Sequence, residues 1–101
     1  MKKAAEYAAS KLENFKERMR ITHKNEDDKL TRMLTSSALA IATLVGASSF
    51  DDTIEELVLE RAMYLYHDSL DEFQKNYSDE IEILYLRNMI IANEGRDDAT
   101  E

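Results

Sequence analysis

Apolar side chains recur every three or four residues along most of this chain, which is the spacing of helices that bury one face. The first stripe predicts a helix from about Lys3 to Arg20. The second predicts a helix that Asn25 caps, that carries acidic residues in its first turn, and that ends at Gly46 in a left-handed conformation. The first stripe comprises Ala4, Ala8, Leu12, Phe15 and Met19, and the second comprises Leu30, Met33, Leu34, Ala38, Ile41, Ala42 and Val45.

The stretch from Leu57 to Tyr66, LVLERAMYLY, is apolar on nearly every side when placed on a helix at about 100° per residue. Such a helix has to be surrounded. Because a chain this short buries a limited share of its surface, we expect part of the cover to come from a neighbouring copy. Asp52 followed by Glu55 predicts the start of this helix. It either continues past His67 to a turn at residues 76–78 or breaks near residues 68–70.

The last segment, residues 79–92, fits two patterns. Its apolar residues form two helical lines, although they also alternate as in a strand, and we favour helix because no second strand is evident to pair with it. The first line is Ile81, Leu84 and Asn88, the second is Ile83, Leu86 and Ile90, and the alternating residues are Ile81, Ile83 and Tyr85. The chain is therefore predicted to be all-α, a small bundle of about four helices. A single domain would span residues 1–93, and residues 94–101, which have nothing to bury, would form a flexible acidic C-terminal tail.

Charge is unevenly distributed along the chain, whose net charge is −8. Seven basic residues and three glutamates up to Lys24 give +4, whereas six basic and 18 acidic residues after it give −12. This asymmetry favours head-to-tail contact between copies, or two faces with different partners. The acidic total argues against general affinity for nucleic acid. The basic first helix nevertheless leaves a small DNA-binding regulatory protein as the alternative function.

Catalytic chemistry has little support in the sequence. The acidic clusters at residues 27–28 and 51–56 are typical of helix starts and lack the spacing of a calcium loop. A metal-dependent nuclease subunit built from those clusters is the remaining enzyme interpretation. His23 and His67 stand alone, and without Cys there is no thiol nucleophile, disulfide or zinc finger. We expect no enzymatic activity and no catalytic, cofactor-binding or metal site.

Membrane association is also not expected. No segment approaches the roughly 20 apolar residues that a membrane-spanning helix needs. The basic, Ala-rich start, Met1 to Ser10, lacks the dense apolar core of a signal peptide. The sequence therefore predicts a soluble protein made in the cytoplasm.

Several segments in order resemble the head-tail connector (adaptor, or head-completion) proteins of tailed bacteriophages. They are LENFKERMRI from Leu12, THKNEDDKL from Thr22, LVG from Leu44, ELVLERAMYLYHDSLDEFQKNY from Glu56 and EIEILYL from Glu80. The resemblance implies a non-enzymatic structural protein of the virion, made in the bacterial host cytoplasm. It would form a ring, dodecameric in the virion, under the portal protein. That ring extends the DNA channel, through which DNA passes without sequence-specific binding, and joins a stopper or tail-completion protein.

Two sets of residues are hypothesised to make these contacts. The all-apolar helix would divide its side chains between the domain core and the neighbouring subunit, and the tail would bind the portal or stopper. The first set is Leu57, Leu59, Met63, Tyr64 and Tyr66, and the second is Glu94, Arg96, Asp97 and Asp98.

Overall fold

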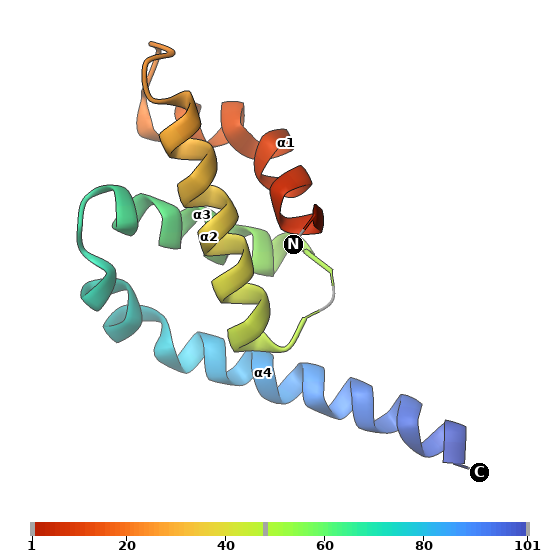
Figure 1. The fold of residues 1–101 in the computed structure, drawn as a ribbon. Coiled ribbons are helices and arrows are strands. Elements are labelled where there is room, and N and C mark those ends of the chain that lie inside the picture. The colour runs from red at the N-terminus through yellow and green to blue at the C-terminus, as the bar shows by residue number, and fades with distance from the viewer. Residues whose placement is uncertain (1, 48, 101) are drawn as a thin grey trace.

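The computed structural model describes the backbone of residues 2–47 and 49–100, and the side chains of residues 4–47 and 49–93. Over these residues the chain folds into four helices: α1 (Lys2–Met19), α2 (Asp27–Val45), α3 (Asp52–Tyr66) and α4 (Leu70–Thr100). Helix α2 occupies the middle and contacts each of the other three (Figure 1). The predicted all-α bundle is confirmed.

The core consists of two apolar clusters that meet along α2. One joins α1 and α3 to the first half of α2, and the other joins α3, α4 and the start of α1 to its second half. The buried members of the first are Ala8, Phe15, Leu30, Leu34, Leu59 and Ala62. Those of the second include Ala38, Ile41, Val45, Ile54, Leu57, Val58, Phe73 and Leu84. Each large aliphatic or aromatic side chain buried here contributes about 1.5–3 kcal/mol relative to an exposed one.

The connection between α1 and α2 is held by an ion pair and not by the predicted cap. The Nζ of Lys16, which is 5% exposed, lies 2.7 Å from Oδ1 of Asp27. The residue at the N-cap of α2 is Glu26, which makes no side-chain capping hydrogen bond. The expectation that Asn25 caps this helix is therefore wrong. The Lys16–Asp27 pair fixes the first turn of α2 against α1, a contact that sequence spacing does not reveal.

Gly46 ends α2 as predicted, with φ at 63° and ψ at 41°. Its N–H donates to the Thr43 carbonyl and the Ala47 N–H donates to the Ala42 carbonyl, at 3.3 and 2.9 Å. This pair of bonds satisfies carbonyls that the helix end would leave open. After the loop, the side chain of Asp51 accepts from the Ile54 N–H at 2.9 Å and caps α3. The predicted capping residue, Asp52, is thus one residue late, because Asp52 is already the first residue of the helix.

The break between α3 and α4 lies at residues 67–69, the second of the two possibilities. Asp68 has φ at 59°, a left-handed conformation that Asp tolerates better than most residues. From Leu70 the helix then runs without interruption to Thr100. The turn expected at residues 76–78 is therefore wrong, and residues 79–92 are helical. The rings of Phe73 and Tyr77 stack with their centroids 4.9 Å apart. This packing holds residues 76–78 in the helix although Asn76 and Ser78 are polar.

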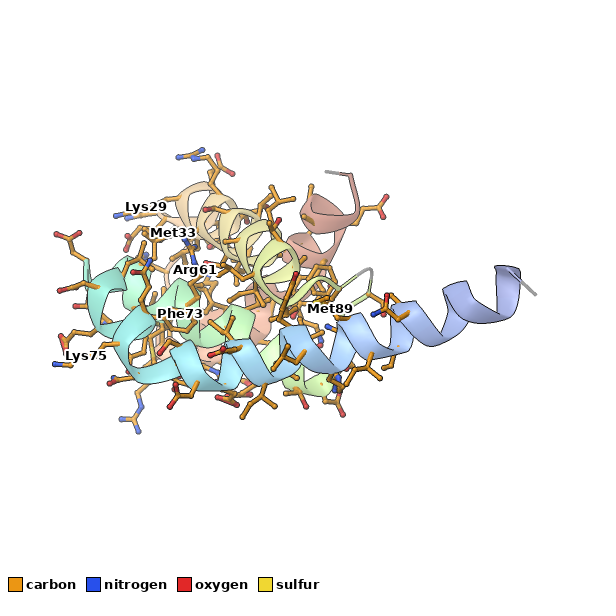
Figure 2. The ribbon with its side chains drawn as sticks, turned by 90° about the horizontal axis from the view of Figure 1, so that it is seen from below. Lys29, Met33, Arg61, Phe73, Lys75 and Met89 are labelled. Atoms are coloured by element: carbon orange, nitrogen blue, oxygen red, sulfur yellow. The ribbon has the colours of Figure 1, made fainter. Side chains whose placement is uncertain are left out.

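The subunit itself covers much of the all-apolar stretch of α3. Leu57, Val58, Leu59 and Ala62 are at most 2% exposed, whereas residues 63–66 are partly exposed. The molecule is elongated, with a radius of gyration of 15.0 Å, compared with about 13 Å for a compact chain of about 100 residues. The elongation comes from α4, whose C-terminal part extends past the bundle (Figures 1 and 2).

Candidate interaction surfaces

The residues predicted for the subunit contact on α3 fall into two groups. Leu57 and Leu59 are buried in the subunit's own core and offer nothing to a neighbour. Met63, Tyr64 and Tyr66 keep part of their surface, and Tyr66 donates a hydrogen bond to Oε2 of Glu26 at 3.0 Å. Contact of these three with another subunit stays a prediction.

A larger apolar surface, which was not predicted as an interface from the sequence, lies on the second half of α4. Its large apolar side chains are between 41% and 66% exposed: Ile83, Tyr85, Leu86, Met89, Ile90 and Ile91. Met89 lies where α4 leaves the bundle (Figure 2). The available signal was the second helical line, because a helix with two apolar lines cannot bury both against one small bundle.

Ile83, Leu86 and Ile90 form what we call the outer stripe. At about 100° per residue these side chains fall within about 60° of one another around α4. Ile81 and Tyr85 each lie about 160° from Ile83, on the opposite side. Ile81 is partly buried against the core, whereas all three residues of the outer stripe are exposed.

A groove of about 390 Å³ runs between α2 and α4 on the side away from the outer stripe. We call it the α2–α4 groove, and it is lined by Leu44, Gln74, Ser78, Ile81, Glu82 and Tyr85. Leu44 is 49% exposed at this position. Three of the six lining residues are large and apolar, so the groove suits an apolar side chain better than a polar ligand.

Two polar contacts, which we call the clamp, attach α4 to the bundle just before the helix extends past the other helices. The amide Nδ2 of Asn88 donates to the Val45 carbonyl at 2.6 Å, and Nη2 of Arg87 lies 3.2 Å from Oδ2 of Asp51. The capping bond from the Ile54 N–H is the main reason that the pKa of Asp51 is lowered, and Arg87 adds to it. These contacts line a second groove of about 540 Å³, where the α2–α3 loop faces α4.

The basic side chains of α1 that the structure describes are engaged within the subunit. Lys11 lies 3.1 Å from Glu55, and Lys16 pairs with Asp27 as described above. Arg18 binds both carboxylate oxygens of Glu56, at 2.7 and 3.1 Å. These hydrogen bonds lower the pKa of Glu56 and raise that of Arg18. Lys11, Lys16 and Arg18 are thus directed at carboxylates of their own chain.

Glu60 joins three helices. One carboxylate oxygen accepts from Nη1 of Arg18 on α1 at 3.1 Å, and the other accepts from the Tyr77 hydroxyl on α4 at 2.9 Å. Burial, together with the bond to Glu60, raises the pKa of Tyr77 to about 12. Glu60 is one of the two polar residues in the all-apolar stretch, and its position explains why a carboxylate is tolerated there.

The other polar residues that could serve in a catalytic or metal site make contacts typical of a folded protein or lie exposed. His23 lies 3.6 Å from Glu26, and His67 is exposed at the end of α3. Arg61 on α3 is partly buried and donates to the Ser37 hydroxyl at 3.0 Å, and burial lowers its pKa. Among the described side chains, no three His, Cys, Asp or Glu lie together as metal ligands would.

The proposed partner-binding residues Glu94, Arg96, Asp97 and Asp98 have side chains outside the described residues. Their backbone continues α4. Whether this segment is a mobile tail that binds a partner stays a prediction.

Comparison with known proteins identifies one family. Its model, described as phage gp6-like head-tail connector protein, matches residues 9–92 of this chain. No curated protein and no solved structure gives a significant match. In the described part of the chain no helix is long and apolar enough to cross a membrane.

Proposed function

Since this chain belongs to the phage gp6-like head-tail connector family, and is therefore a structural protein of a phage virion, we propose that it is the adaptor subunit beneath the portal vertex. Copies of it form a ring there, extend the DNA channel and join the head to the tail components. The family match, which covers most of the chain, carries this proposal. The dodecameric ring is the form proposed for the virion.

The exposed apolar surface of α4 supports assembly with other copies. Seven large apolar side chains of the described residues, six of them on α4, are roughly half exposed. Most of them gather in two places, the outer stripe and the edge of the α2–α4 groove, and exposed apolar residues that gather on a surface often mark sites of contact with other proteins. A surface of this kind is usual for a protein that works in contact with others.

The charges support a DNA channel in preference to a DNA-binding regulator. A regulator would need Lys and Arg free for phosphates. Here Lys11, Lys16 and Arg18 already pair with carboxylates of their own subunit. With a net charge of −8, a ring of such subunits repels DNA and lets it pass without adhering.

The C-terminal segment is the proposed contact to the portal or the stopper. Residues 94–101 contain four acidic residues and one arginine. A variant that ends at residue 93 should keep the melting temperature of the full chain but fail to join portal-bearing heads. Normal joining by this variant would contradict the role of the segment.

Electron microscopy of portal-bearing heads mixed with the purified chain tests the adaptor function. We expect added ring density at the portal vertex, and none on heads assembled without portal, which serve as the control. Absence of density at saturating protein would refute the proposed function. A monomer in free solution would not, because the portal can act as the template for the ring.

A further inference from the structure

We infer that α4 carries both halves of the contact between neighbouring copies, with the outer stripe of one copy seated in the α2–α4 groove of the next. This inference rests on the proposed function, in which identical copies repeat around a ring. It names the two surfaces that meet and the direction in which they meet. The occupant of the groove is a second copy of this chain.

The arrangement of the two surfaces prevents the outer stripe of a copy from binding in the groove of the same copy. The outer stripe and the groove residues Ile81 and Tyr85 lie on nearly opposite sides of one rigid helix, so the stripe of a copy cannot reach its own groove. A two-fold dimer joins a surface to itself. Two different surfaces that fit each other produce a head-to-tail contact, which closes into a ring when the rotation allows.

The chemistry of the two surfaces is complementary. The stripe is aliphatic, and the groove offers Leu44, Ile81 and the Tyr85 ring. Arg87 stands about 40° from Ile83, at one edge of the stripe, and also pairs with Asp51. Glu82 stands about 40° from Leu86, between the other edge of the stripe and the groove, and forms no ion pair with the described side chains. In a groove-against-groove contact the Glu82 carboxylates of two copies would repel each other, whereas Arg87 of one copy approaches Glu82 of the next when the stripe lies in the groove.

The contact area indicates how strong this contact is. Stripe and exposed groove side chains together expose roughly 550 Å², well below the 1,200–2,000 Å² of a stable interface. Free copies should therefore associate weakly. Copies held side by side on a portal would meet at a far higher effective concentration, so the same contact can serve in a ring.

A mixing experiment with two half-defective variants tests the inference. Leu86→Asp places a charge in the outer stripe and leaves the groove intact. Leu44→Lys places a charge in the groove and leaves the outer stripe intact. Both positions are about half exposed, and a lysine near the end of α2 suits the helix dipole, so both variants should fold. Thermal melting followed by circular dichroism checks this for each variant before mixing.

Nitrogen-15 NMR then reads the contact residue by residue. Labelled Leu86→Asp at millimolar unlabelled Leu44→Lys should show amide shift changes around Ser78 and Tyr85, in the groove. With the labels reversed, the changes should move to Ile83 and Ile90. Each variant alone should show no dependence on concentration, and the mixture should stop at one-to-one pairs, because each pair uses the only intact surface of each member.

The control is Lys75→Asp, an exposed change on the same helix outside both surfaces, which should associate as the wild type does. Absence of shift changes in both labellings, or changes on both faces of one labelled variant, would overturn the inference. If the proposed adaptor function is wrong but this inference is right, the experiments give a different result. In that case the mixed variants still pair through stripe and groove, but wild-type protein adds no ring to portal-bearing heads.

Discussion

Replacing Gly46 by alanine should destabilise the fold by about 1 kcal/mol through backbone conformation alone. The added Cβ would lie 3.6 Å from Cδ1 of Tyr85, an ordinary contact that displaces nothing. The φ of 63° remains unfavourable for alanine, at a cost of about 1–2 kcal/mol. The smaller conformational freedom of alanine in the unfolded chain offsets about 0.4–1 kcal/mol of that.

Thermal unfolding of the monomer measures this cost. For a chain of about 100 residues, 1 kcal/mol lowers Tm by about 4–8 °C. Gly46→Asn is the matched control, because asparagine accepts the left-handed region more readily, and it should lose about half as much. If Gly46→Ala melts at or above the wild-type temperature, or if both variants lose the same amount, the conformation of Gly46 is not what ends α2.

Two further variants test the core and the start of α3. Phe73→Ala should cost about 3–5 kcal/mol, measured by urea unfolding, because Phe73 is 1% exposed between α2, α3 and α4; Phe73→Leu, which leaves a smaller cavity, should cost clearly less. Asp51→Asn should lower Tm at pH 7, and the difference should shrink as the pH falls below about 4. The reason is that the pKa of Asp51 is lowered in the folded state, so its carboxylate stabilises the fold above that range and loses this effect as it is protonated. A difference that stays constant down to pH 3 would show that the charge contributes nothing.

The number and type of the helices followed from apolar spacing, which is a local property of the sequence. The left-handed end at Gly46 was equally predictable, because one residue type dominates that position. The turn expected at residues 76–78 was not formed, since Asn and Ser cost only tenths of a kcal/mol in a helix. The Phe73–Tyr77 packing supplies more than that. The weak turn propensity of residues 76–78 therefore counted for less than the contact between Phe73 and Tyr77, which could not be read from the sequence.

The candidate surfaces were harder to predict, because exposure depends on how much of each helix the others can reach. The most apolar stretch, on α3, was predicted to contact the neighbouring subunit, but four of its residues lie in the subunit's own core. Helix α4 looked less apolar by composition, yet it extends beyond the bundle (Figure 1), and six of its large apolar side chains are exposed. Similarly, charge counting showed a basic α1, while only the packing of α3 against it revealed the bonds from Arg18 to Glu56 and Glu60.

The clamp formed by Asn88 and Arg87 also gives α4 a mechanical property. From Asn88 to Thr100 the backbone of the helix extends about 18 Å. Tilting it by about 10° at the clamp therefore moves its tip by about 3 Å. The clamp joins α4 to the end of α2 and the cap of α3, and Leu84 of the same helix packs in the core. A load applied at the tip therefore acts first on the Asn88–Val45 and Arg87–Asp51 contacts, which lie nearest to the projecting segment.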